Sequence, residues 1–318
     1  MTMPSLALPL AAGAYSGELA ALGTAVCWTA SALAFTAAAR RLGVLSLNLI
    51  RLGMALLFAA VLMGIVRGLP LPTDATGREW FWLSLSGLVG LVFGDLCLFQ
   101  ALVVLGPRRT MLTFSLAPIL AALLGWLVLG EALGPKAWIG MALVIGGVAL
   151  VILEKPPEAA PGSDSASGRV TLEGALLALG AALGQAAGMV LAKIGMAGTY
   201  DVFAATQIRM IAGIAAFALL VMVLGRGRRF VEALRHRAGL GFAAVGAFFG
   251  SFVGVSLSLI AVKYAQVGVA TTIISIVPVL IIPAVVVLYK ERVTLRAVLG
   301  ACAAVAGVAL LFIRASNG

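Results

Sequence analysis

The sequence predicts an all-α integral membrane protein with about ten transmembrane helices in two inverted five-helix repeats. Of its 318 residues, 62% are hydrophobic and 11% are charged, whereas soluble domains carry about 25% charged residues. The apolar residues form runs of about 20 residues, the length that an α-helix needs to cross about 30 Å of hydrocarbon. Because lipid offers the backbone no hydrogen-bond partners, the spanning segments are expected to be helices.

Ten apolar runs each predict one spanning helix, and short connections between most of them favour antiparallel neighbours. The connection 154–168 (EKPPEAAPGSDSASG) is rich in Pro, Gly, Ser and acidic residues, which is typical of a solvated linker. The connection 226–237 (RGRRFVEALRHR) mixes basic and apolar residues, so we expect it to lie among lipid headgroups. The predicted spans are 18–39, 46–66, 79–105, 109–130, 135–153, 170–193, 202–224, 239–263, 268–289 and 294–313.

The second half of the chain repeats the first. The stretch 115–150 aligns without gaps onto 275–310, and both end in GVAL. Matched residues are Pro118 and Pro278, Glu131 and Glu291, and Gly140 and Gly300. We therefore predict a first repeat at 1–153, a linker at 154–169 and a second repeat at 170–318. Since each repeat has an odd number of helices, the second enters the membrane from the opposite side, an arrangement in which carriers bind substrate between the halves.

At these residues the chain resembles the drug/metabolite transporter superfamily and, within it, the EamA-type carriers. The pattern is a run of small residues, a mid-helix proline, an LGE-like helix end and a Gly-rich closing helix, FSLAPILAALLGWLVLGEALGPKAWIGMALVIGGVAL (114–150). The second half departs from it, because LYKE replaces LGE and Pro283 is additional. The resemblance implies a central cavity walled by both halves, alternating access and cytoplasmic termini. Its members move amino acids, nucleotide sugars, other metabolites or drugs, so it does not define a substrate.

Asp95 is the sharpest candidate for a functional residue. It lies well inside the third predicted span, where an ionised carboxylate costs a few kcal/mol unless it faces protein or water. It is interpreted as a proton-coupling site or as the counter-ion of a cationic substrate group. The structural alternatives are an ion pair with Arg51, or a protonated acid bonded to a neighbouring helix. The matched position in the second half is Ser251, so a charge-based role is asymmetric.

Arg51 and Arg209 occupy equivalent places near the start of the second helix of each repeat. This symmetry favours a role in bracing the fold or a gate, and both side chains are long enough to snorkel toward the interface. Binding of a substrate carboxylate by Arg209 is the alternative.

The paired prolines and glutamates are predicted to be structural or gating residues. Pro118 and Pro278 each remove a backbone donor in mid-helix, which allows a hinge or a cavity-facing carbonyl, or a static kink. Glu131 and Glu291 close their helices and oppose the helix dipole unless they are paired. We interpret these two as interfacial structure and not as substrate ligands.

Uncharged polar residues inside the spans are expected to line the transport path. Hydroxyl groups are weak indicators, because they also bond to their own helix. Amide and indole groups are stronger ones, since each needs a partner. The candidates are Trp28, Thr29, Gln100, Thr113, Ser115, Gln185, Ser256, Thr272 and Ser275.

The fifth and tenth helices carry almost no polar residues. They contain Ala142-x-x-x-Gly146 and Ala303-x-x-x-Gly307, and small residues four apart allow close helix approach. We expect these helices to be scaffold or the surface of a homodimer.

Charge and motifs argue against several other functions. The net charge of +10 sits between the apolar runs, where basic residues set topology and meet anionic headgroups, so no nucleic-acid partner is expected. The only histidine is His236, and there is no HExxH or Walker motif. We therefore expect no enzyme activity, no cofactor and no metal, with a solute or proton gradient as the energy source.

The charge distribution conflicts with the orientation that the resemblance implies. With both termini in the cytoplasm, most Lys and Arg residues, including those of 226–237, would lie outside. The positive-inside rule favours the opposite orientation. Orientation and transport direction stay open at this point.

The expected function is gradient-driven transport of small metabolites such as amino acids, with export favoured, in a bacterial inner membrane. A broad drug-efflux carrier, a lipid-modifying membrane enzyme and a non-transporting membrane protein are the alternatives. The expected partners are a small-molecule substrate and the lipid bilayer.

Overall fold

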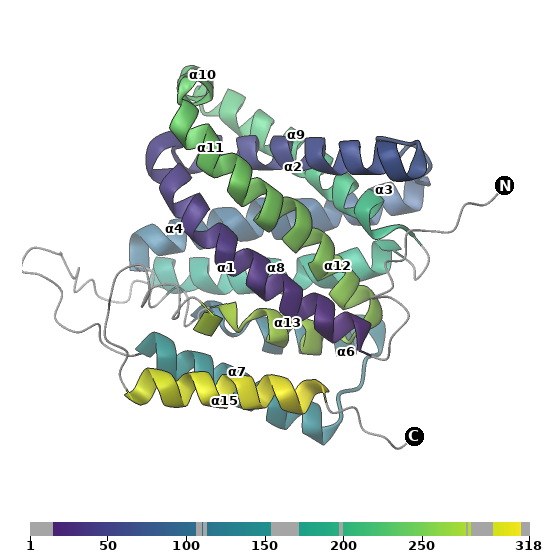
Figure 1. The fold of residues 1–318 in the computed structure, drawn as a ribbon, viewed down its shortest axis with the longest axis vertical. Helices are drawn as coiled ribbons and strands as arrows, with labels where there is room; N and C mark the ends of the chain where they lie inside the picture. Colours follow the sequence, from purple (N-terminus) through teal and green to yellow (C-terminus); the bar gives the residue numbers. More distant parts are fainter. Residues whose placement is uncertain are drawn as a thin grey trace, which may run out of the picture. The chain divides into compact units, whose positions relative to one another are not determined.

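The structure, a computed structural model, describes residues 15–105, 110, 113–153, 172–196, 200–277, 279–280 and 295–312 (Figure 1). Within these residues all regular secondary structure is helical. The α-helices are α1 (Ser16–Leu42), α2 (Val44–Arg67), α3 (Gly77–Gly87), α4 (Asp95–Leu105), α6 (Ala117–Leu129), α7 (Pro135–Leu153), α8 (Leu172–Met196), α9 (Val202–Val223), α10 (Gly227–Arg235), α11 (Arg237–Gly246), α12 (Val255–Tyr264), α13 (Val267–Ile274) and α15 (Leu295–Phe312). Two π-helices, η2 (Leu88–Gly94) and η3 (Ala247–Gly254), join α3 to α4 and α11 to α12.

Five helical runs among the described residues are long and apolar enough to cross a membrane. They are Val44–Arg67, Gly77–Leu98, Leu172–Met196, Val202–Val223 and Arg237–Tyr264, and shorter apolar helices cover Ala117–Leu129, Pro135–Val151 and Val298–Leu311. These helices confirm the prediction of an all-α membrane protein, whereas the total of ten spans stays a prediction.

The ends of several helices follow from local sequence. Gly68 and Gly130 end α2 and α6 with φ angles of 70° and 68°, a left-handed conformation that glycine adopts without steric cost. Thr76 and Glu79 form a capping box at the start of α3. The Asp201 side chain accepts a hydrogen bond from a backbone N–H in the first turn of α9, which satisfies one of the amide donors that every helix start exposes.

The helices form two compact units, and each unit takes helices from both halves of the sequence. Unit 1 comprises Met1–Val92 and Ala187–Ala265, and unit 2 comprises Phe93–Ala186 and Gln266–Gly318. The compact units are therefore not the sequence repeats themselves.

In unit 1, α1 packs along the run formed by α11, η3 and α12. Glycines of that run lie against side chains of α1. A Cβ atom added at Gly246 would lie 2.6 Å from the Phe35 ring, and one added at Gly254 would lie 2.6 Å from the Trp28 indole. Glycine is needed here because the α1 side chains occupy the space that a Cβ would fill.

Helices α2 and α9, which occupy matched places in the two repeats, run antiparallel in unit 1. Arg67 at the end of α2 lies 3.9 Å from Asp201, just before the start of α9. Gln207 in the second turn of α9 donates a hydrogen bond to the carbonyl of Pro70, beyond the end of α2. Opposite directions of matched helices are what an inverted repeat requires.

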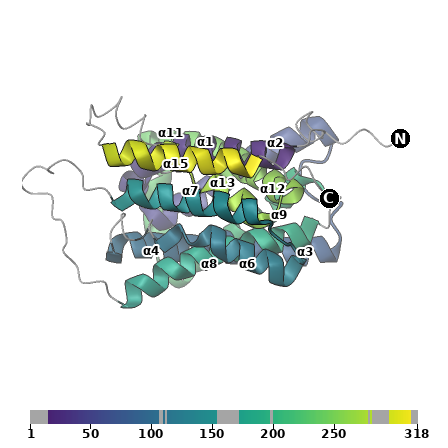
Figure 2. The same ribbon diagram turned by 90° about the horizontal axis from the view of Figure 1, so that it is seen from below.

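Unit 2 contains a second matched pair, α7 and α15, which lie side by side in both views (Figures 1 and 2). A Cβ added at Gly147 would lie 2.5 Å from the carbonyl oxygen of Gly300, and one at Gly307 would lie 2.7 Å from that of Gly140. Earlier residues of α7 thus meet later residues of α15, so this pair is also antiparallel. The backbones touch directly, as small-residue interfaces between membrane helices allow.

The two small-residue motifs of these helices, Ala142-x-x-x-Gly146 and Ala303-x-x-x-Gly307, have different surroundings. Gly307 is buried against α7, so it serves packing within the chain. Ala142 and Gly146 lie on an exposed part of α7, with open space beside Gly146. The homodimer stays a prediction.

The contact between α7 and α15 yields a prediction with a matched control. Gly147→Ala places a methyl group 2.5 Å from one backbone atom and 2.6 Å from another, so we expect it to destabilise the protein by about 1–3 kcal/mol. Gly146→Ala, one residue earlier, meets open space and should be neutral or stabilising by up to about 1 kcal/mol, because alanine favours helix more than glycine does. SDS denaturation in mixed micelles measures both variants. Equal denaturation midpoints would contradict the assigned packing.

Candidate functional site

Asp95 is the first residue of α4 and follows directly on the π-helix η2. It is partly buried and lies within the apolar run Gly77–Leu98. The structure therefore places this carboxylate inside a membrane-spanning run, in agreement with its position in the sequence. Its role in coupling or substrate binding stays a prediction.

The two π-helices occupy overlapping places in matched spans of the two halves, and the sequence analysis did not predict them. Each π-helix ends on a glycine, Gly94 in η2 and Gly254 in η3, and both segments are rich in glycine. A π-helix makes i→i+5 hydrogen bonds and often occurs at functional sites. The repeated spacing of glycines within two otherwise apolar spans is the sequence signal that could have located them.

Several other predicted path residues lie in unit 2. Gln100 is exposed on α4, Gln185 is partly buried on α8, and Ser115 is buried just before α6, with Thr113 partly buried beside it. Thr272 donates its hydroxyl hydrogen bond to the Gly268 carbonyl of its own helix. Ser275 does the same to the Thr272 carbonyl. These two hydroxyls satisfy their donors locally, which is the usual behaviour of such residues in apolar helices.

The predicted path residues of unit 1 also make local contacts. Thr29 donates to the Ala25 carbonyl at 2.8 Å. Ser256 is buried, and its hydroxyl lies 3.5 Å from that of Thr206 on α9. The Trp28 ring packs against Gly254, so its apolar surface contributes to the contact between α1 and η3.

Arg51 links three helices of unit 1. Its Nε donates to Asn48 Oδ1 at 2.8 Å and its Nη1 donates to Ser251 Oγ at 3.4 Å. Its guanidinium carbon lies 5.6 Å from the centre of the Phe35 ring, a cation–π geometry. Arg51 thus joins α2 to η3 and α1, which supports the bracing interpretation.

Arg209 is only 2% exposed, so its side chain stays inside unit 1 and does not snorkel. Its backbone packs directly against α3, because a Cβ at Gly87 would lie 2.5 Å from the Arg209 carbonyl oxygen. An arginine buried this deeply is rare in a membrane protein and costly to place. The matched arginines of the two halves therefore lie in different surroundings.

Glu131 caps a helix of the other sequence half. Its Oε2 accepts a hydrogen bond at 2.8 Å from the backbone N–H of Val267, the first residue of α13. Gln266 adds a hydrogen bond to the Ala132 carbonyl at 2.8 Å. A carboxylate at a helix N-terminus is favourable because the helix dipole is positive there. The dipole that Glu131 faces is thus that of α13 as well as that of its own helix.

Of the remaining residues predicted to be structural, the structure describes Pro118. Pro118 is buried in the first turn of α6, where proline is well tolerated because its missing N–H has no intrahelical partner. It therefore starts the described helix and does not kink its middle. Pro278 and Glu291 lie outside the described residues.

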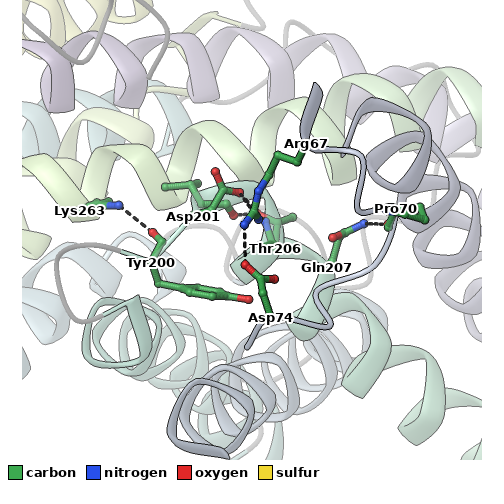
Figure 3. Close-up of polar contacts among 10 residues, drawn as sticks. Arg67, Pro70, Asp74, Tyr200, Asp201, Thr206, Gln207 and Lys263 are labelled. Atoms are coloured by element: carbon green, nitrogen blue, oxygen red, sulfur yellow. Dashed lines mark hydrogen bonds and ion pairs between the residues drawn. The ribbon is translucent and has the colours of Figure 1, made fainter. Parts of the chain in front are cut away.

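A polar cluster that sequence reasoning missed joins the connections at one end of unit 1 (Figure 3). Arg67 lies between Asp74, at 2.5 Å, and Asp201, at 3.9 Å. Lys263 at the end of α12 donates to the Tyr200 carbonyl at 2.7 Å. The connections after α2, before α9 and at the end of α12 are thereby held together. No motif marks this cluster, because its members come from three separate stretches of sequence.

Burial controls the ionisation of Tyr200 in this cluster. It raises the pKa of the Tyr200 hydroxyl above its ordinary value, and the carboxylates of Asp74 and Glu79 raise the pKa further. A tyrosine hydroxyl is protonated at neutral pH in any case, and the raised pKa keeps that of Tyr200 protonated further into the alkaline range. Since the side chains of Arg67 and Asp74 are 28% and 34% exposed, their ion pair contributes at most about 1 kcal/mol to stability.

These observations define a polytopic helical membrane protein whose two halves are interleaved and carry charged residues inside apolar spans. The family model for the EamA-like transporter family matches residues 15–153 and 172–313. The chain belongs to this family and is a membrane transporter.

Two similar proteins carry names that agree with this assignment, and one solved structure shares the fold. The permease-like protein YdzE of Bacillus subtilis (strain 168) is 49% identical over 47 residues, which cover 15% of this chain and 60% of that protein. An uncharacterized transporter from the cobO 3' region of Sinorhizobium sp. is 31% identical over 129 residues, which cover 39% of this chain and 90% of that protein. A solved crystal structure is similar in fold, with a TM-score of 0.68 and 19% identity, over 94% of this chain and 96% of that one.

The cap formed by Glu131 can be tested with two substitutions. Glu131→Ala removes the acceptor for the Val267 N–H and should lower the free energy of unfolding by about 1 kcal/mol, the typical effect of losing a helix cap. Glu131→Gln keeps an oxygen acceptor at the same reach and should lose less than Glu131→Ala. Thermal melting in detergent micelles compares the two. Equal losses for both variants would show that the charge, and not the hydrogen bond, is what matters.

Proposed function

We propose that this transporter is a secondary-active carrier of small metabolites such as amino acids, working by alternating access and exporting its substrate. The observation that carries the proposal is Asp95, a partly buried carboxylate inside an apolar span. Acidic residues at such positions commonly serve proton relays or substrate binding. The bacterial origin of the two similar proteins supports the inner membrane as its location.

Two features of the fold support the proposal of alternating access. In carriers built from inverted repeats, alternating access is largely a rocking or gating of one repeat against the other around a fixed site. Here α2 pairs with α9 and α7 pairs with α15, each pair antiparallel and drawn from both halves. The π-helices η2 and η3 interrupt matched spans, and π-helical segments are frequent at functional sites.

Asp95 supports coupling to a proton or to a cationic substrate group. A carboxylate that alternates between a wetter and a drier environment changes its proton affinity, because burial disfavours the charged form. That change is the physical basis by which proton movement would drive solute movement. An amino acid carries an ammonium group that the ionised carboxylate would bind.

The test measures substrate binding and its dependence on Asp95. A ligand that binds the folded protein raises its apparent melting temperature by mass action. We expect a saturable rise from one class of metabolites, with amino acids as the first panel. Asp95→Asn should weaken the apparent affinity obtained from this rise by at least about tenfold, because a lost charge contact of about 1.4 kcal/mol corresponds to that factor.

Glu173→Gln provides the matched control, since Glu173 is an exposed acid in the first turn of α8. It changes the charge as Asp95→Asn does and should leave the response intact. Counterflow into proteoliposomes loaded with the stabilising compound then tests transport itself. Equal thermal responses in wild type and Asp95→Asn would remove Asp95 from the site, and absence of counterflow would contradict transport of that compound.

A further inference from the structure

Helix α10 (Gly227–Arg235) is short, strongly amphipathic and rich in arginine. On a helical projection, Phe230, Val231, Ala233 and Leu234 fall on one side, while Arg228, Arg229, Glu232 and Arg235 fall on the other. Such a helix with a basic polar face is typical of segments that lie in the membrane interface.

The apolar side of α10 has two parts with different surroundings. Ala233 is 5% exposed and belongs to a hydrophobic cluster with residues of α1, α2 and α11, and Phe230 packs against the same cluster. Val231 and Leu234 are 49% and 46% exposed. The buried part fixes α10 on unit 1, and the exposed part leaves apolar surface directed away from the protein.

Exposed arginines of α1, α10 and α11 lie at the same end of unit 1 as this apolar surface. Arg41 at the end of α1 lies over the Phe242 ring of α11, with its guanidinium carbon 5.0 Å from the ring centre. The end of α1 therefore adjoins the segment that carries α10 and the start of α11. The exposed arginines of this end are Arg40, Arg41, Arg226, Arg228, Arg229, Arg235 and Arg237.

Little negative charge offsets these arginines within the described part of the chain. Glu232 lies 3.5 Å from Arg228 as an (i, i+4) pair, and it is the one acidic residue in the segment 226–237. A cationic surface beside exposed apolar side chains matches a molecule that has an anionic head and an apolar tail.

We propose that α10, together with the end of α1 and the start of α11, is a binding surface for anionic phospholipids. The arginines bind the lipid phosphates, and Val231 and Leu234 insert among the upper parts of the acyl chains. Arginine suits this role because its planar guanidinium pairs with phosphate oxygens in a bidentate manner. The surface is separate from the polar residues assigned to transport, so the proposal does not depend on the transport mechanism.

The test compares retention of phosphatidylglycerol with that of phosphatidylcholine by native mass spectrometry of the full-length protein in detergent. Wild type should retain phosphatidylglycerol in preference, and the preference should fall as salt rises because salt screens exposed charges. The double variant R229Q/R235Q should bind phosphatidylglycerol roughly thirty-fold more weakly, given what each arginine contributes near an anionic surface.

The control is K136Q/R296Q, which removes the same charge from exposed positions on α7 and α15 of unit 2. It should keep the wild-type preference. Unchanged helix content and a single elution peak for both double variants show that each is folded. Equal retention of the two lipids by wild type, or equal weakening in both double variants, would overturn the proposal.

Discussion

Direct backbone contact between helices of the two sequence halves is the constraint on which the rest of this structure depends. In unit 2, Gly147 meets the backbone of α15, and in unit 1, Gly87 meets the backbone of α9. Between apolar helices in lipid, hydrophobic burial does not favour association, so close van der Waals packing has to supply it. Glycine at the crossing points makes that packing possible, and this is why each compact unit contains helices from both halves.

Close packing also decides what the polar residues can do. Thr29, Thr272 and Ser275 bond to carbonyls of their own helices, which removes their donors from the list of strong ligand candidates. Arg51 donates hydrogen bonds to Asn48 and Ser251, which both lie in unit 1. Asp95 differs from these residues because it is acidic, lies within an apolar run and directly follows a π-helix. It therefore remains the residue on which the functional proposal rests.

The connections between helices are held by polar side chains and not by backbone packing. Glu131 reaches across to cap α13, and Arg67 with Asp74 and Asp201 ties the start of α9 to the end of α2. At the arginine-rich end of unit 1, by contrast, the segment 226–237 carries five arginines and one acidic residue, Glu232. The first two arrangements satisfy polar groups within the protein, and the last leaves charge available to the surrounding bilayer.

The sequence by itself determined the membrane class, the helical secondary structure, the approximate limits of most described helices and the duplication, because each depends on local hydropathy or on direct alignment. Asp95, Arg51 and Arg209 could be singled out in the same way, since a charge inside an apolar run is visible without coordinates. Only the tertiary structure decided that Glu131 caps α13, that Arg209 is fully buried, and that Arg67 meets two carboxylates distant in sequence. It also located the two π-helices and interleaved the halves into compact units. These features depend on which helices approach one another closely enough to touch, and hydropathy along a single chain carries no information about that approach.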